Sequence, residues 1–408
     1  MGSMSSDVML ARAFLSRIAE PACVPVWALV RRLGPIGAVA AIRAGDTSDE
    51  VRSATSARLA AIEPEADLEA AERHGIRLVA PEHPEWPHFA LGALERAALV
   101  RLAAHGPKHH KTDEGGAPIP PLALWVRGDA ELAALGTRSV AIVGSRASTD
   151  YGNLVARELA YALASRDVPV VSGGAHGIDG SAHRGALVAD GVTVVVSAAG
   201  LDRPYPPGNA DLFARAAERG LVISESPPGA APHRQRFLTR NRLIAAFGTG
   251  TVVVEAAYRS GAQNTVRHCR KIGRPVMAVP GPVTSTMSAG CHDLIRFEPS
   301  PATLVTSADD VLAVIDSSVV PSETAADVRP EAPPDVRRAA LDALDPSVRR
   351  VFDGLRSRHA AQVDEIAARS GVPVVDVIRS LPLLELNGLV LARPDGYVVS
   401  PAPAPSPG

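Results

Sequence analysis

Two glycine turns are the first features of this sequence that could bind a ligand. Gly144-Ser145-Arg146 follows the apolar run 139–143, and Gly173-Gly174-Ala175 follows a second run at 168–172. A stretch with helical periodicity comes after each turn, so backbone N–H groups are expected to lie free at a helix N-terminus, where they favour phosphate. Arg146 adds a guanidinium group that can hold a phosphate through two hydrogen bonds. The turns therefore predict an anion-binding site.

Neither turn has the signature of a known nucleotide site or catalytic centre. GxGxxG is absent and no Gly-Lys-Ser/Thr follows, which disfavours a dinucleotide cofactor and ATP hydrolysis. Serine-hydrolase, zinc-protease and Cys–His motifs are also absent from the sequence. His176, Asp179 and His183 could form a metal or acid–base site, but no further ligand stands nearby, and Asp179 could simply cap a helix. We expect no catalytic residue, no metal and no cofactor.

An arginine cluster at 233–242 (HRQRFLTRNR) gives a second indication. It contains Arg234, Arg236, Arg240 and Arg242, with no acid between them. Because the whole chain carries a net charge of −2, only such a local patch could hold an anionic partner. A polyanion would relieve the repulsion between these groups; the alternatives are a solvated face or ion pairs with acids distant in sequence. Phe237, within the cluster, could stack on a base or anchor in the core.

The elements that position these residues form an alternating pattern between 122 and 306. Short β-branched runs bounded by Gly or Pro alternate with helical segments, which predicts strands buried on both faces and a parallel sheet. The runs are 122–126, 139–143, 168–172, 192–196, 221–224, 251–255, 275–279 and 303–305. This is a Rossmann-like, doubly wound α/β core. Ligands of such sheets bind beyond the carboxyl ends of the strands, where the glycine turns lie.

Smaller modules are expected on both sides of this core. The predicted organisation is a helical domain of the SAM or helix-hairpin-helix kind at 4–102, a linker or insertion at 103–121 and the Rossmann-like domain, which carries the anion site, at 122–316. A linker at 317–335, a winged-helix domain at 336–400 and a disordered tail at 401–408 follow. Gly34-Pro35-Ile36-Gly37 breaks two helical segments, either as a DNA-backbone-binding hairpin or as a plain helix turn. Residues 8–100 otherwise read as short helices.

Composition narrows the class of protein further. Of the 408 residues, 46% are apolar, which excludes wholesale disorder, and only 4% are aromatic, which disfavours an extended base-stacking platform. The three cysteines, Cys23, Cys269 and Cys291, make no CxxC pair, so a reducing compartment fits. With no apolar run of about 18 residues and no signal-peptide pattern, we expect a cytoplasmic protein.

The ordered motifs between 122 and 306 resemble the DNA-processing protein A family, also called DprA or Smf. Matching segments include Val140-Ala141-Ile142-Val143-Gly144-Ser145-Arg146, Tyr151-Gly152, Ser172-Gly173-Gly174-Ala175, Gly177-Ile178-Asp179, Tyr205-Pro206-Pro207, Asn209, Ile223-Ser224-Glu225, Pro228-Gly229, Arg240-Asn241-Arg242-Leu243-Ile244, Val253-Val254-Glu255-Ala256, Ser260-Gly261-Ala262 and Ala278-Val279-Pro280-Gly281. A helical N-terminal module and a winged helix are also similar to the longer family members.

The resemblance implies a function. It implies a protein that binds and protects incoming single-stranded DNA and loads the RecA recombinase in natural transformation and DNA recombination, with no enzymatic turnover, no membrane association and a homodimer formed through the Rossmann-like domain. Arg146 would be the phosphate-contacting arginine and Arg234 would fill an expected basic position. The rest of that wall would be Phe237, Arg240, Asn241 and Arg242.

Two other classes remain open. Gly248-Thr249-Gly250-Thr251 with Glu255 is faintly similar to the motif of lysine-decarboxylase-like phosphoribohydrolases, which would make the chain a nucleotide hydrolase. A partner-docking adaptor without DNA binding is the second alternative.

The predicted winged-helix domain is formally neutral, because residues 334–400 contain nine Arg and nine acidic residues. This balance favours contact with a protein over recognition of a DNA groove.

Overall fold

The structure is a computed structural model that describes residues 4–105, 116–135, 137–258, 260–297, 300–317, 341, 344–355 and 360–400. The chain divides into two compact units, Met1–Ala326 and Asp327–Gly408. Residues 318–335 of the predicted linker at 317–335 and the predicted tail at 401–408 lie outside the described residues, as do residues 106–115 of the predicted insertion at 103–121.

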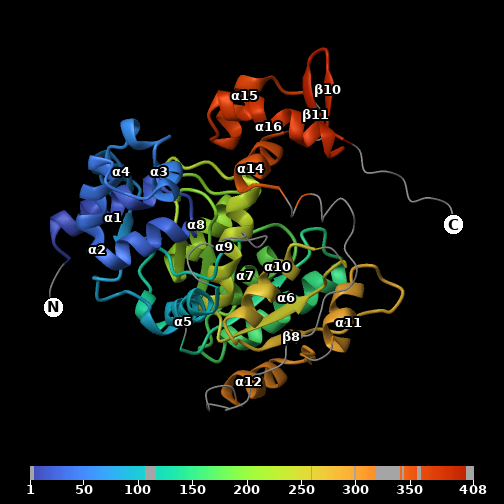
Figure 1. The fold of residues 1–408 in the computed structure, drawn as a ribbon. Coiled ribbons are helices and arrows are strands. Elements are labelled where there is room, and N and C mark those ends of the chain that lie inside the picture. Colours follow the sequence, from blue (N-terminus) through green and yellow to red (C-terminus); the bar gives the residue numbers. More distant parts are fainter. Residues whose placement is uncertain are drawn as a thin grey trace. The chain divides into compact units, whose positions relative to one another are not determined.

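A nine-stranded sheet forms the centre of the larger unit (Figure 1). Its strands are β1 (Ile76–Val79), β2 (Leu124–Arg127), β3 (Val140–Gly144), β4 (Val170–Ser172), β5 (Thr193–Val196), β6 (Leu221–Ser224), β7 (Gly250–Val254), β8 (Val276–Ala278) and β9 (Thr303–Leu304). They lie in the order β1-β2-β6-β5-β4-β3-β7-β8-β9. All pairs from β6 to β9 are parallel, which confirms the doubly wound core.

Two expectations about this sheet were wrong. Residues 76–79 form a strand rather than part of a helix, and β2 runs antiparallel to both of its neighbours. Gly75, at φ +64°, ends the preceding helical segment and lets the chain turn into β1. The N-terminal region therefore contributes an edge strand to the sheet, in addition to its helices.

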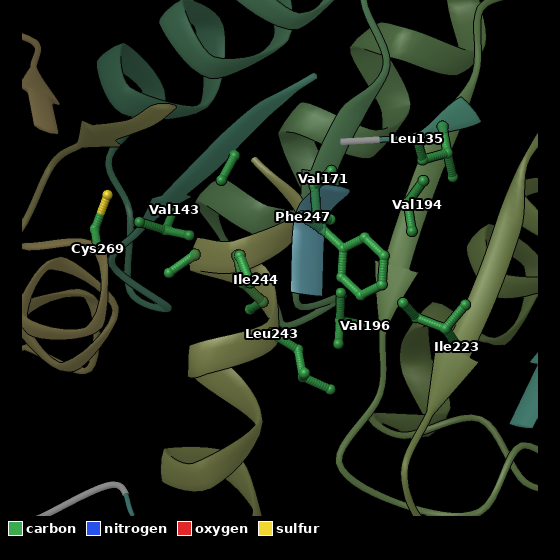
Figure 2. Close-up of a cluster of buried hydrophobic side chains, with 14 of the residues drawn as sticks. Leu135, Val143, Val171, Val194, Val196, Ile223, Leu243, Ile244, Phe247 and Cys269 are labelled. Carbon is green, nitrogen blue, oxygen red and sulfur yellow. The ribbon is translucent and has the colours of Figure 1, made fainter. Parts of the chain in front are cut away.

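Helices cover both faces of the sheet. One face packs against α5 (His88–His105), α9 (Arg234–Phe247), α10 (Ala262–Lys271) and α11 (Ala289–Arg296). The other face packs against α6 (Asp150–Ala164), α7 (Ile178–Val188), α8 (Ala210–Arg219) and α12 (Ala308–Ser317). Alternate strand residues serve the two faces: Val194 and Val196 lie on the first and Val195 on the second. Figure 2 shows Phe247, at the end of α9, among Val171, Val194 and Val196 in the first core.

The N-terminal helices pack against this larger core. They are α1 (Ser6–Ile18), α2 (Val24–Ala44), α3 (Asp49–Thr55) and α4 (Pro64–Arg73). The predicted break is confirmed, because Gly34 is non-helical, at φ 72° and ψ 170°. Within the described ranges, α2 is the one helix long and apolar enough to cross a membrane by length and composition. Gly34 interrupts it, and Val26 and Leu29 are buried in the packed core.

The smaller unit has the expected winged-helix pattern. Helices α14 (Pro346–Gly354), α15 (Val363–Ser370) and α16 (Val374–Leu386) precede the hairpin of β10 (Val390–Arg393) and β11 (Gly396–Val399). Ala361 pairs with Tyr397 and extends the hairpin by a bridge. Ile366, Leu381 and Val390 belong to a hydrophobic core that this unit forms by itself.

Candidate nucleic-acid interface

The carboxyl ends of the central parallel strands bring the predicted site residues to one edge of the sheet. Gly144-Ser145-Arg146 ends β3, and Gly173-Gly174-Ala175 follows β4. The segment after β5 carries Tyr205, and the segment after β6 leads into α9. Because β6, β5, β4 and β3 are parallel neighbours, these four connections lie next to one another. Strands β4, β5 and β6 lie on one side of β3, and β7 lies on its other side. The strand order therefore reverses between β3 and β7, and parallel sheets bind ligands at such a switch point.

Phe237 is the centre of a small aromatic and cationic cluster at this edge. Its ring centroid lies 5.6 Å from that of Tyr205, and the two rings are tilted by 47°. The guanidinium carbon of Arg146 lies 5.3 Å from the Phe237 centroid, and that of Arg240 lies 5.8 Å away. Tyr205 is 44% exposed and Phe237 is half-buried. Ring faces beside guanidinium groups are what single-stranded nucleic acid needs from a protein surface.

Sequence reasoning did not place Tyr205 in the site. Its ring comes from the segment after β5, and only the fold brings it to Phe237. We name the surface formed by Tyr205, Phe237 and Arg146, together with the Arg240 side chain beneath it, the stacking platform.

The first glycine turn is held by a buried carboxylate. Glu255, just after β7, accepts hydrogen bonds from the backbone N–H of Thr149 at 2.8 Å and from its hydroxyl at 2.5 Å. Gly152 is required for this approach, because a Cβ there would lie 2.2 Å from Oε2 of Glu255. The N–H of Ser145 donates to the Glu255 carbonyl at 2.8 Å. Glu255 thus occupies the N-terminus of α6 and fixes the loop that carries Arg146.

Asp179 holds the second turn in the same way. Its carboxylate accepts a hydrogen bond from the N–H of Gly173 at 3.2 Å and another from the backbone of Ala175. Burial raises the pKa of Asp179, although the charge of Arg240 and these backbone hydrogen bonds oppose the shift. The amide of Asn209 donates to the carbonyl of Gly174 at 3.0 Å. The turn at 173–175 is therefore held by hydrogen bonds to the buried carboxylate of Asp179 and to the amide of Asn209.

These contacts show that part of each turn is already hydrogen-bonded inside the protein. The N–H groups of Ser145, Thr149 and Gly173 already have acceptors inside the protein. Two carboxylates, Glu255 and Asp179, stand where an anion was expected at the helix N-termini.

Arg242 does not belong to the surface. Its side chain has no exposed area and makes a two-fold ion pair with Glu225, at 2.5 and 2.6 Å. The expectation that Arg242 contacts DNA is corrected for this reason. Glu225 stands 17 residues earlier, at the end of β6, so the pair ties α9 to the sheet.

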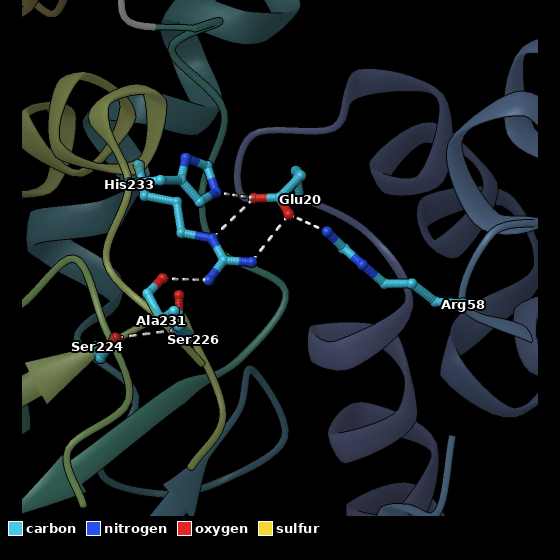
Figure 3. A network of polar contacts seen from close by, with 7 residues as sticks. Glu20, Arg58, Ser224, Ser226, Ala231 and His233 are labelled. Carbon is cyan, nitrogen blue, oxygen red and sulfur yellow. Dashed lines mark hydrogen bonds and ion pairs between the residues drawn. The ribbon is translucent and has the colours of Figure 1, made fainter. Parts of the chain in front are cut away.

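Arg236 is likewise neutralised by an acid, this time Glu20 in the segment between α1 and α2. Glu20 accepts from Nε and Nη2 of Arg236 at 2.9 and 2.8 Å, and also pairs with Arg58 (Figure 3). Burial would raise the pKa of Glu20, but hydrogen bonds from His233 and Arg236 and the charges of Arg236 and Arg58 hold it well below its ordinary value. The predicted four-arginine patch is therefore not one continuous surface.

Arg240 lies beneath the second glycine turn. It donates to the carbonyls of Gly173, at 2.8 Å, and Val196, and only 6% of the residue is exposed. Burial lowers its pKa to about 10; the Asp179 carboxylate opposes the shift and the Arg146 guanidinium adds to it. Arg240 therefore stays charged at neutral pH, but it serves the site from below, by shaping the loop and supporting the Phe237 ring.

The remaining predicted residues stand on α9 or at the first turn. Arg146 and Arg234 are exposed, and Arg234 is the first residue of α9. Arg234, Phe237 and Asn241 share one face of that helix by their spacing of three and four. Asn241 donates from its amide to Asn264 at 3.1 Å.

The residues that could have formed a metal site or a nucleotide-hydrolase site are the next to be placed. His183 is buried and shares a 2.7 Å contact with the Thr193 hydroxyl, and burial, with the charges of Arg184 and Arg240, lowers its pKa to about 3. In the described ranges, no group of three or more His, Cys, Asp or Glu could hold a metal ion. Thr249 precedes β7 and Glu255 follows it, which separates them by about 20 Å at ~3.3 Å per residue. The hydrolase-like motif is split between opposite edges of the sheet.

Comparison with known protein families agrees with this reading. The model for DNA recombination-mediator protein A matches residues 107–316, and that for the DprA winged helix domain matches residues 330–396. A putative DNA processing protein DprA from Mycobacterium tuberculosis is 46% identical over 383 residues, covering 93% of this chain and 92% of that protein.

Further relatives extend the similarity. Protein Smf of Escherichia coli is 38% identical over 285 residues, covering 68% of this chain and 71% of that protein. The X-ray structure of DNA processing protein A from Streptococcus pneumoniae aligns with a TM-score of 0.58 at 28% identity, covering 76% of this chain and 98% of that one. This chain therefore belongs to the DNA recombination-mediator protein A family, whose members carry the names DprA and Smf.

Proposed function

We propose that the chain binds single-stranded DNA at the stacking platform. The observation that carries this proposal is the half-buried Phe237 ring in contact with Tyr205 and two guanidinium groups, at the switch point of a parallel sheet. Unpaired bases can stack on the two rings, whereas paired bases in a duplex cannot turn a face toward them. Arg146 and Arg234 would contact the phosphates, with Asn241 beside them on α9.

The structure favours binding that depends on the backbone and on stacking rather than on sequence. Guanidinium groups recognise phosphates without reading bases, and a ring accepts the face of any base. Arg240, Gly173, Gly174, Ala175, Gly144 and Ser145 take part as the framework of the loops. The carboxylates of Glu255 and Asp179 hold these loops in place through hydrogen bonds that need no DNA.

The proposed role is that of a recombination mediator in the cytoplasm. The matching family model is named for recombination mediation. We extend the proposal to protection of single-stranded DNA and loading of the RecA recombinase, by a homodimer formed through the Rossmann-like domain and without enzymatic turnover. In the winged-helix unit, α16 exposes Val375, Ile378 and Leu386. An apolar surface of this kind supports contact with a protein rather than with a DNA groove.

Binding titrations with single-stranded and double-stranded oligonucleotides test this function. Arg146→Ala combined with Arg234→Ala should weaken single-strand binding by at least about tenfold, or ~1.4 kcal/mol. Arg166→Ala is the matched control, because Arg166 pairs with Asp309 and precedes β4, at the opposite edge of the sheet. Equal affinity of the double variant and the wild type, or tighter binding of duplex than of single strand, would overturn the proposal.

A further inference from the structure

A second basic surface adjoins the stacking platform. An open hollow of about 700 Å³ lies between the N-terminal halves of α6 and α7. These two helices pack against each other (Figure 1). Arg146, Arg157 and Arg184 line it, each from a different segment: the loop after β3, α6 and α7. Its volume falls within the range of pockets that hold small ligands.

The charge of this hollow is not balanced from within. All three arginines are exposed, and across the described ranges none has a carboxylate within ion-pair distance. Asp150 is the one carboxylate among the lining residues, so the lining carries a formal charge of about +2. Arg184 donates to the amide oxygen of Asn209 at 3.2 Å, which leaves its remaining donors for a ligand. An anion with several oxygen atoms is the ligand that such a lining recognises.

Arg146 connects the hollow to the stacking platform. Arg146 lines the hollow, and its guanidinium carbon lies 5.3 Å from the Phe237 centroid. A strand whose base stacks on Phe237 therefore brings its phosphate to the entrance of the hollow. Polar side chains also line the hollow: the hydroxyls of Ser148 and Ser181 both donate to the amide oxygen of Asn153, at 2.7 and 2.9 Å.

We propose that this hollow binds the phosphates of the next nucleotides in the same DNA strand, through Arg157 and Arg184. The path of the DNA then runs from Phe237 past Arg146 and between α6 and α7. This inference rests on the proposed function and extends it, because it makes the footprint longer than one stacked nucleotide. A free nucleotide carries the same phosphate chemistry, and the experiment below separates the two sources.

The test compares oligothymidylates of about 4 and about 16 nucleotides, which bracket the usual single-strand site sizes. Arg157→Ala combined with Arg184→Ala should weaken binding of the longer strand about tenfold or more, and of the shorter strand less. The slope of log K against log salt should fall by about 1.4, since each phosphate contact in a single strand contributes about 0.7. Arg157→Ala alone should show half of that slope change, and it removes no hydrogen bond of the described chain.

The matched control is Arg166→Ala combined with Arg219→Ala. It removes the same charge, but both residues pair with acids, Asp309 and Asp190, near the amino ends of the strands. We call Arg157→Ala combined with Arg184→Ala the hollow variant. An equal loss of oligonucleotide affinity in the control would overturn the inference, and so would a hollow variant that binds the longer strand as tightly as the wild type does. So would binding of thymidine monophosphate that the hollow variant loses while its oligonucleotide affinity is unchanged. A wild type that binds no oligonucleotide would refute the proposed function itself.

Discussion

Replacing Phe237 separates stacking from charge in the proposed site. The ring is half-buried, and the Tyr205 ring and the guanidinium groups of Arg146 and Arg240 all lie within 6 Å of its centroid. Phe237→Ala removes both the aromatic face and apolar volume. Phe237→Leu keeps most of the volume and removes only the face, so the pair of variants distinguishes base stacking from packing.

The expected magnitude follows from one lost stacking contact. Base–aromatic stacking is worth about 1–3 kcal/mol per base, and at 25 °C each 1.36 kcal/mol is about tenfold. Both variants should therefore bind single-stranded oligonucleotides about 5-fold to 150-fold more weakly than the wild type. Only Phe237→Ala should also lower the urea midpoint clearly, because it alone leaves a space against its neighbours.

Fluorescence anisotropy at several salt concentrations is the appropriate assay. Neither variant removes a charge, so the slope of log K against log salt should change by less than about 0.7, the contribution of one phosphate contact. Phe237→Leu binding within twofold of the wild type would refute stacking on this ring. A slope reduced by one contact or more would mean that the ring acts by positioning Arg146.

Three further predictions concern the supporting structure. Glu225→Ala leaves the charge of Arg242 buried without its partner and should destabilise the larger unit by about 3–5 kcal/mol; an unchanged urea midpoint would contradict the buried pair. Glu20→Gln should destabilise the protein at pH 7. The pKa of Glu20 is held below its ordinary value in the folded protein. The stability difference between the wild type and the variant should therefore be full above the unfolded-state pKa of about 4.3, and should narrow as the pH falls through the folded-state pKa. A gap in urea midpoints equal at pH 7 and at acid pH would refute this linkage. Removal of 327–408, a unit with its own core, should leave most single-strand affinity intact, and a loss beyond about tenfold, or ~1.4 kcal/mol, would place the binding in the winged helix.

The sheet was predictable because local pattern determines it. Runs such as 192–196 and 221–224 are β-branched, short and bounded by glycine or proline, and each became a strand. The glycine turns were predictable for the same reason, since they follow these runs. Residues 76–79 were missed, because four residues at a sheet edge carry little periodicity and only pairing with β2 makes them a strand.

The site was predictable only in outline. The sequence places Arg236 and Arg242 in one basic cluster, but their partners, Glu20 and Glu225, are 216 and 17 residues away. Spacing along one helix cannot say which arginines acids will neutralise. Glu255 is similarly 106 residues from the Thr149 that it caps. Long-range pairing thus decided which charges reach the surface.

The most direct test of the central claim is to locate the bound DNA. A single-stranded oligonucleotide carrying 5-iododeoxyuridine can be irradiated in complex with the full chain, and the crosslinked peptides identified by mass spectrometry. A base stacked on the platform should crosslink to the peptides that contain Tyr205 or Phe237. Crosslinks found only in the winged-helix unit, or only in the N-terminal helices, would contradict the account.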